Sequence, residues 1–229
     1  MRLSWQQIPS TIISDILSQN QLDGVVIDTE HGGFNTETLG ACIQVVTLNK
    51  KKCFVRLTEI NKTLIRICLD MGCDGLIFST IETKEASESI RDMCIYPKNG
   101  GKRGLGLVRE NLWGMKDLVK KSDPVLIAQI ETSKGVDNIK EILDTNVFNF
   151  YMIGPYDLSA SVGIPGDFEN KNYQESVSRV RKYIPDKKMA VHIPVNVKNE
   201  KKKYENYGII AMGMDTTSII KHYKEIEDA

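Results

Sequence analysis

The fold is decided by a stretch that reads Gly24-Val25-Val26-Ile27-Asp28-Thr29-Glu30-His31. A short apolar run ends here in charged and titratable groups. The same junction recurs at three other places: 53–55 before Arg56, 125–130 before Glu131, and 151–154 before the turn to Asp157. A (β/α)₈ barrel forms its active site from polar groups at the carboxyl ends of buried parallel strands. The pattern therefore predicts a single (β/α)₈ TIM barrel of the α/β class, with its site at the C-terminal mouth.

Strand-like and helix-like segments alternate along the chain. Apolar runs predict eight strands, at residues 3–7, 24–28, 52–56, 74–79, 125–130, 149–153, 189–193 and 209–213. Each is followed by apolar residues at helical spacing. A glycine-rich loop at 98–106 and an irregular stretch at 154–172 interrupt this order, and long loops in compact domains are usually functional or disordered. No linker or repeat divides the sequence, so residues 1–229 are predicted to form one catalytic domain.

The main competing fold is a doubly wound open sheet. Both folds bury their parallel strands on two faces, so continuous apolar runs such as 76–78 fit either one. A dinucleotide-binding sheet carries a G-x-G-x-x-G turn after its first strand, and none follows the first strand here. Gly104-Leu105-Gly106 lacks the later glycine and the strand-to-helix context. The barrel is therefore favoured, in a form slightly shorter than the usual length of about 250 residues.

The composition is that of an ordinary globular protein and excludes several classes of function. The 30 basic and 30 acidic residues balance, so no net charge favours nucleic acid or a membrane surface. We expect no secretory signal after Met1, and no apolar run approaches the ~18 residues of a membrane span. The five cysteines show no C-x-x-C spacing, which indicates reduced core thiols in a cytoplasmic protein.

Two acidic residues follow neighbouring predicted strands. Glu131 and Asp157 would both point into the mouth of a barrel, and two carboxylates with water suit a hard divalent ion such as Mg²⁺ or Mn²⁺. The alternative is structural, because either residue could cap a helix or form a salt bridge at a strand end. Asp157 precedes Leu158-Ser159, which keeps helix capping open.

A histidine and an arginine lie at two further strand ends. His31, flanked by Glu30 and a glycine pair, is placed to act as a general acid–base, or else it is a solvated loop residue. Arg56 suits a carboxylate or a developing enolate oxygen. Its alternative role is a salt bridge across the rim to Asp28 or Glu30.

Taken together, these residues make the chain similar to the HpcH/HpaI aldolase family, the metal-dependent (class II) pyruvate aldolases. Six motifs match in family order and spacing over almost the whole chain. They are Ile27-Asp28-Thr29-Glu30-His31-Gly32, Val55-Arg56, Arg103-Gly104-Leu105-Gly106, Gln129-Ile130-Glu131-Thr132, Gly154-Pro155-Tyr156-Asp157-Leu158-Ser159 and Gly213-Met214-Asp215-Thr216.

The resemblance implies a pyruvate-domain-like barrel that reversibly cleaves a 4-hydroxy-2-oxo acid to pyruvate and an aldehyde. Glu131 and Asp157 would hold a divalent metal, Mg²⁺ or Mn²⁺ with Co²⁺ as a further candidate, which stabilises the pyruvate enolate. Arg56 would add positive charge at the enolate oxygen. His31 would be the acid–base, with Asp70 as its orienting carboxylate.

The remaining implications of the resemblance concern substrate binding and assembly. Gln129, Pro155, Tyr156 and Asp157 would line the pyruvate site together with Arg56, and backbone N–H groups of residues 154–157 would hold the pyruvate carboxylate. Pro155 has no N–H to donate. Asp70 also has a structural alternative, as a polar residue at a helix end. The family's C-terminal helix often packs on a neighbouring subunit, which predicts a homo-oligomer, a trimer or hexamer.

The chain departs from the family pattern at two places. Tyr156 stands where the family commonly has a small residue, and Ser79-Thr80 replaces a common proline. Two other functions stay open: a related barrel enzyme, similar to citrate synthases, that condenses or decarboxylates oxaloacetate-like 2-oxo acids, and a non-catalytic 2-oxo-acid binder. The presence of His31 argues against the binder, because binding alone needs no acid–base group.

Overall fold

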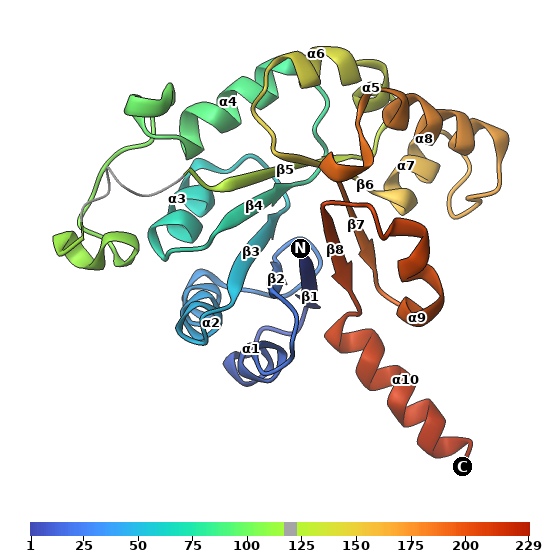
Figure 1. Ribbon diagram of the computed structural model, residues 1–229, viewed down its shortest axis with the longest axis horizontal. Helices are drawn as coiled ribbons and strands as arrows, with labels where there is room; N and C mark the ends of the chain where they lie inside the picture. The colour runs from blue at the N-terminus through green and yellow to red at the C-terminus, as the bar shows by residue number, and fades with distance from the viewer. Residues whose placement is uncertain (117–122) are drawn as a thin grey trace.

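The computed structural model describes residues 1–116 and 123–229, and the strands form a closed parallel barrel (Figure 1). The strands are β1 (Arg2–Gln6), β2 (Gly24–Asp28), β3 (Lys52–Leu57), β4 (Gly75–Phe78), β5 (Val125–Ile130), β6 (Phe150–Ile153), β7 (Met189–Ile193) and β8 (Ile209–Met212). Each pairs with the next in sequence, and β8 closes on β1 with Ala211 beside Leu3. The predicted (β/α)₈ barrel is confirmed.

Helices connect the strands around the outside of the barrel (Figure 1). The α-helices are α1 (Thr11–Ser18), α2 (Thr36–Leu48), α3 (Lys62–Asp70), α4 (Lys84–Cys94), α5 (Ser133–Asp137), α6 (Ile139–Asp144), α7 (Pro155–Ser161), α8 (Lys171–Tyr183), α9 (Val197–Glu200) and α10 (Asp215–Glu227). Short 3₁₀ turns are η1 (Pro97–Asn99), η2 (Arg109–Gly114), η4 (Asp186–Lys188) and η5 (Lys201–Tyr204).

One segment differs from the sequence prediction. The stretch 154–172 was expected to be irregular, but it opens with α7, which follows β6 after a single residue. Pro155 occupies the first turn of α7. A proline fits there because its fixed φ is helical and its missing N–H has no partner in the first turn anyway. Pro155 therefore begins α7, whereas a proline in the interior of a helix would interrupt it.

The barrel interior determines which residues reach the mouth. Its apolar filling comes from alternate strand positions: Leu3, Trp5, Val26, Phe54, Ile77, Ile127, Met152, Ala190, Ile209 and Ala211. Successive side chains of a strand point to opposite faces. Among the next inward positions beyond this filling are four charged or polar side chains, Asp28, Arg56, Gln129 and His192. The alternation therefore aims these four side chains at the C-terminal mouth.

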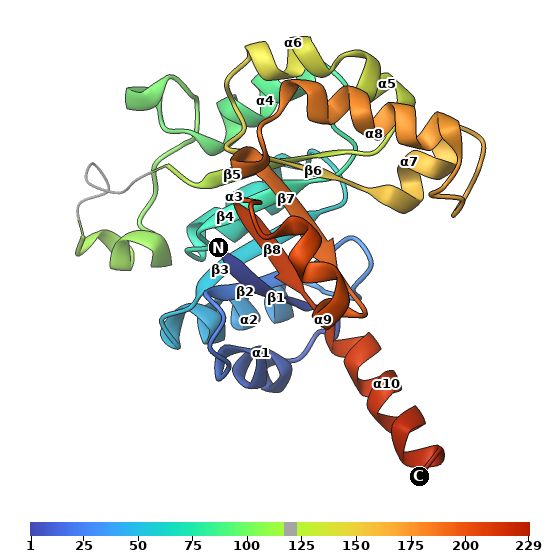
Figure 2. The ribbon, with the colours of Figure 1, turned by 45° about the vertical axis from the view of Figure 1, so that its right-hand side comes forward.

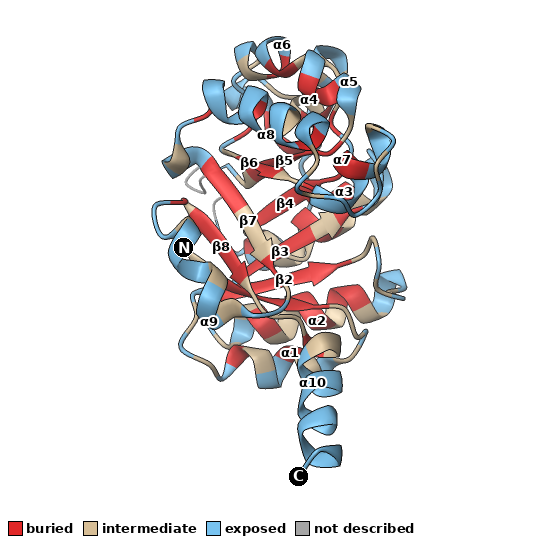
Figure 3. Ribbon diagram, turned by 90° about the vertical axis from the view of Figure 1, so that its right-hand side faces the viewer, coloured by how far each residue is buried: buried red, intermediate tan, exposed pale blue. Residues whose placement is uncertain are grey.

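The last helix leaves the barrel surface. Figures 1 and 2 show α10 projecting away from the strands, and Figure 3 shows its outer turns fully exposed. It carries exposed apolar side chains, among them Ile220, Tyr223 and Ile226, each more than half accessible. No helix in the described ranges 1–116 and 123–229 is both long and apolar enough to cross a membrane.

All five cysteines are buried, and none forms a disulfide. They pack among the apolar residues between the barrel wall and its helices. Burial raises the pKa of Cys68 and of Cys94 to about 12, since an apolar setting disfavours the thiolate. These thiols are therefore part of the core, in keeping with the sequence interpretation.

Candidate active site

The mouth of the barrel holds a cavity of about 310 Å³. Its wall combines groups from β1, β3, β5, β6 and β7 with residues of the turns that follow the strands. The lining residues are Trp5, Gln7, His31, Arg56, Gln129, Met152, Ile153, Gly154, Pro155, Tyr156, Asp157, His192, Pro194 and Met214. Six of the residues predicted for the site therefore border one cavity. They are His31, Arg56, Gln129, Pro155, Tyr156 and Asp157.

Arg56 is held between two carboxylates. Its Nε and Nη2 atoms donate to Oδ1 and Oδ2 of Asp28 at 2.9 and 2.6 Å, and Nη1 lies 2.8 Å from Oε2 of Glu30. The ion pairs considered as alternatives from the sequence are thus both present. A guanidinium has five donor hydrogens. These contacts engage only part of that set, so Arg56 is oriented by its carboxylates and keeps donors for a ligand.

Asp28 also organises the turn that carries His31. The carboxylate is fully buried, accepts from Nε1 of Trp5 at 3.1 Å, and accepts from the backbone N–H groups of Glu30 and His31 at 3.1 and 3.3 Å. Burial alone would raise the pKa of Asp28, but the hydrogen bonds and charge of Arg56 outweigh it and leave the pKa lowered. Asp28 therefore stays ionised and fixes the backbone from which the exposed His31 side chain reaches the cavity.

Glu131 lies buried just beyond β5. Its Oε1 accepts from the backbone N–H and the hydroxyl of Thr80 at 2.6 and 2.9 Å, and its Oε2 accepts from the amide of Gln129. Thr80 donates from a backbone with φ of 54°, which only a few non-glycine residues adopt. Burial raises the pKa of Glu131, and the hydrogen bonds from Thr80 and Gln129 offset this only in part. A nearby cation would relieve the cost of this buried charge.

Gly154 makes room for the Glu131 carboxylate. A Cβ atom at position 154 would lie 2.8 Å from both Nε2 of Gln129 and Cβ of Glu131, and closer still to Oε2 of Glu131. Its φ of −90° is open to any residue, so the need for glycine here is steric. Position 154 therefore has no room for a side chain, because Gln129 and Glu131 occupy the space.

The first turn of α7 completes this side of the mouth. Pro155, Tyr156 and Asp157 all line the cavity, and Asp157 is exposed there in the first turn of the helix. The Tyr156 ring packs edge-on against Phe168 at 5.2 Å between centroids. Asp157 thus presents a carboxylate to the cavity three residues after Gly154, next to the strand that carries Glu131.

The residues at this edge fit a hard divalent cation. The Oε1 atom of Gln129 is buried and has no hydrogen-bond partner among the described residues, and this residue contacts Glu131 and lines the cavity together with Asp157. Within residues 1–116 and 123–229, no three acidic, histidine or cysteine side chains cluster tightly enough to enclose a metal by themselves. Magnesium-like ions accept such open sites because they keep several waters or substrate oxygens.

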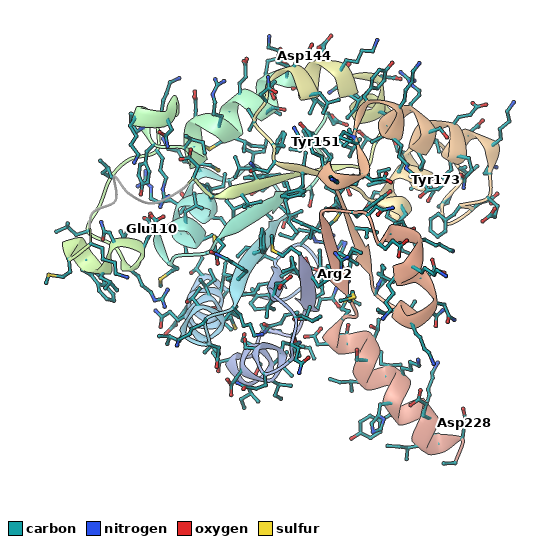
Figure 4. The ribbon with its side chains drawn as sticks, viewed as in Figure 1. Arg2, Glu110, Asp144, Tyr151, Tyr173 and Asp228 are labelled. Carbon is teal, nitrogen blue, oxygen red and sulfur yellow. The ribbon has the colours of Figure 1, made fainter. Side chains whose placement is uncertain are left out.

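Asp70 does not lie at the mouth of the barrel. It ends α3, and a helix that follows a parallel strand ends at the opposite face of the barrel from the mouth. Its carboxylate pairs with Nη2 of Arg103 at 2.9 Å, and Arg103 also contacts Glu110 at 2.5 Å. Figure 4 shows Glu110 at the other side of the molecule from Tyr173, which lies near α7. Within one chain, therefore, the structure does not bring Asp70 to His31.

Trp5, Thr80 and His192 are among the residues of the site that were not predicted from the sequence. Trp5 and His192 line the cavity and stack on each other, and Thr80 supplies two hydrogen bonds to Glu131. His192 lies in the run 189–193 that the sequence predicts as a strand. Its spacing of two from Ala190 is the signal for an inward position at the strand end. No comparable signal in the sequence identifies Thr80.

Comparison with known proteins agrees with this geometry. The model of the family described as HpcH/HpaI aldolase/citrate lyase matches residues 4–222. A 2-keto-3-deoxy-L-rhamnonate aldolase of Klebsiella pneumoniae is 28% identical over 185 residues, or 77% of this chain and 69% of that protein. A 4-hydroxy-2-oxovalerate aldolase of Rhodococcus jostii is 25% identical over 223 residues, or 95% of this chain and 86% of that protein.

Solved structures share the fold at lower sequence identity. A crystal structure of an HpcH/HpaI aldolase/citrate lyase family protein from Burkholderia cenocepacia superposes with a TM-score of 0.91 at 21% identity, over 100% of this chain and 93% of that one. The citrate synthase SbnG superposes with a TM-score of 0.83 at 24% identity, over 99% of this chain and 91% of that one. These matches bear on the architecture alone.

Proposed function

Because the chain belongs to the HpcH/HpaI aldolase/citrate lyase family, we propose that it is a divalent-metal-dependent pyruvate aldolase. Its reaction is the reversible cleavage of a 4-hydroxy-2-oxo acid to pyruvate and an aldehyde, carried out by one catalytic domain. This proposal rests on one observation. Arg56, His31 and Asp157 line the same cavity, and the carboxylate of Glu131 lies against Gly154 of its wall.

Glu131 and Asp157 are the proposed protein ligands of the ion, with Mg²⁺ or Mn²⁺ favoured by their hard oxygen donors and Co²⁺ as a further candidate. When bound, the ion supplies Lewis-acid stabilisation of the enolate of pyruvate. Gln129 orients one oxygen of Glu131, and its own amide oxygen is buried without a hydrogen-bond partner among the described residues. The remaining steps belong to side chains of this chain.

Arg56 contributes positive charge where the enolate oxygen develops. Asp28 and Glu30 hold the guanidinium before substrate arrives, so no reorganisation is needed during the reaction. His31 removes the proton from the 4-hydroxyl group in cleavage and returns it in the aldol addition, directly or through a water molecule. Pyruvate would lie against Gln129 and the turn formed by residues 154–157.

Asp70 as the orienting carboxylate of His31 stays a prediction, and one chain does not fulfil it. Asp28 is the carboxylate that one chain places beside the His31 backbone. We therefore assign the positioning of the His31 turn to Asp28, and any contact between Asp70 and His31 would need a second copy of the chain.

A homo-oligomer is the proposed assembly, and a cytoplasmic location fits the unpaired thiols. The exposed apolar face of α10 and the exposed Ile12 and Ile16 of α1 are surfaces that association would bury. Sedimentation velocity of the purified chain distinguishes a trimer or hexamer from a monomer of 25.8 kDa. A monomer at all concentrations would contradict this assembly.

The test of the proposed activity needs no knowledge of the aldehyde. Exchange of the pyruvate methyl protons with deuterated water is followed by NMR in the presence of Mg²⁺, Mn²⁺ or a chelator. We expect exchange that the chelator abolishes and that Glu131→Ala does not support. A folded, metal-loaded protein without exchange would refute the aldolase assignment, and turnover of oxaloacetate by that protein would favour the condensing or decarboxylating enzymes instead.

A further inference from the structure

His192 borders the cavity but has no part in the proposed chemistry. It lies on β7, on the wall of the mouth that includes Trp5 and Met214. Its ring stacks on Trp5 with a centroid distance of 3.9 Å and an interplanar angle of 8°, and Arg56 lies over the same indole at 4.9 Å. The plane of the imidazole is therefore fixed by packing.

One nitrogen of the ring is already committed. Nε2 lies 3.2 Å from the carbonyl oxygen of Gly213. A carbonyl oxygen only accepts hydrogen bonds, so Nε2 must carry the hydrogen. In the neutral imidazole this leaves Nδ1 as a bare acceptor.

The neutral form is the one present near neutral pH. Burial lowers the pKa of His192 to about 4, the carbonyl of Gly213 opposes this effect, and the charge of Arg56 adds to it. Across the described part of the chain, no group donates a hydrogen bond to Nδ1. Nδ1 is also not one of the fully buried polar atoms that lack a partner, so it is accessible. Nδ1 therefore faces the open cavity that the ring lines.

The chemistry of the substrates restricts what this acceptor can bind. The ketone and carboxylate oxygens of pyruvate only accept hydrogen bonds, and so does the carbonyl of an aldehyde. Apart from the 4-hydroxyl group that His31 deprotonates, the available donor is a hydroxyl group that a sugar-like or hydroxylated aldehyde adds. We propose that His192 is a specificity-determining residue whose Nδ1 accepts a hydrogen bond from a hydroxyl group of the aldehyde portion, so that hydroxyaldehydes are preferred. This inference rests on the proposed aldolase function.

The test uses the full chain with Mg²⁺ and compares matched aldehydes in the addition of pyruvate. The pairs are 2-hydroxypropanal with propanal and glycolaldehyde with acetaldehyde. We expect wild-type kcat/KM to favour the hydroxylated member by about tenfold or more, because sites built to bind a hydroxyl reject its absence strongly. His192→Phe keeps an aromatic ring against Trp5 but has no acceptor, and its preference should fall to about onefold. His192→Asn, which retains an acceptor, should recover part of the preference.

Proton exchange of pyruvate separates this inference from the proposed function. The aldehyde preference is a ratio of two kcat/KM values measured within one protein, so any change in the exchange rate of His192→Phe cancels from it. An unchanged hydroxyl preference in His192→Phe, or exchange without addition to either hydroxyaldehyde, would overturn the role of His192 alone. Absence of exchange in the wild-type protein would overturn the aldolase assignment and this inference with it.

Discussion

Replacing Gly154 with alanine should weaken metal binding in a protein that still folds. The added methyl group would lie 2.8 Å from Nε2 of Gln129 and Cβ of Glu131, whereas ordinary van der Waals contact begins at 3.4 Å. These two atoms must therefore retreat by about 0.6 Å, and Oε2 of Glu131, which is closer still, must move further. Metal–ligand distances tolerate changes of only about 0.2 Å. We expect the metal affinity to fall by roughly 10- to 100-fold, the loss typical when the support of a ligand is disturbed.

The assay is a titration of pyruvate proton exchange with Mg²⁺, together with a thermal unfolding scan. Overpacking at Gly154 should lower stability by about 1–3 kcal/mol, which corresponds to a lower Tm by several degrees. Gly104→Ala is the matched control, because a Cβ atom there meets open space and should leave both measurements unchanged. A folded Gly154→Ala protein with the wild-type metal midpoint would show that the bare position beside Glu131 does not serve metal binding.

Three further substitutions probe the charged and titratable groups of the mouth. Glu131→Gln should abolish metal-dependent exchange without lowering Tm in chelator, because burial raises the pKa of Glu131 and makes its charge costly without a cation; exchange that survives would disprove its role as ligand. Asp28→Asn should lower the free energy of unfolding in urea by about 3–5 kcal/mol, since it breaks a buried pair with Arg56; a wild-type urea midpoint would contradict this. His192 has a folded pKa of about 4, below the unfolded value of 6.5. The contribution of neutral His192 to the free energy of unfolding is therefore complete above pH 6.5. It declines as the pH falls toward 4, by about 2 kcal/mol between pH 7.5 and pH 5. On the same acidification, the free energy of unfolding of His192→Phe should fall by about 2 kcal/mol less than that of the wild type, and identical pH profiles of the two proteins would show that His192 is not held neutral.

Much of the site was predictable because parallel strands confine their carboxyl ends to one face. A charged residue that closely follows a buried run is expected at the mouth, and the structure has Arg56 and Asp157 at the cavity and Glu131 in contact with Gln129 of its lining. His31 follows the same rule one turn later. The grouping of these residues depends on topology more than on the details of packing.

The parts of the site that the sequence did not predict have a different origin. Asp70 stays a prediction that one chain does not fulfil, because the end of a helix that follows a strand returns to the far face of the barrel. The stack of Trp5 and His192 joins the two ends of the sequence, and only closure of the barrel between β8 and β1 brings them together. The start of α7 was missed because Pro155 reads as a breaker unless it is known to be the first residue.

The buried thiols have a consequence for a protein that handles aldehydes. Aldehydes are electrophiles, and the thiolate is the form of cysteine that attacks them. With all five sulfur atoms enclosed, and the pKa of Cys68 and Cys94 near 12, almost no thiolate is available to a released product. Reaction of the aldehyde product with the protein would then occur at surface amines, and the cysteines of the barrel would remain unmodified over many turnovers.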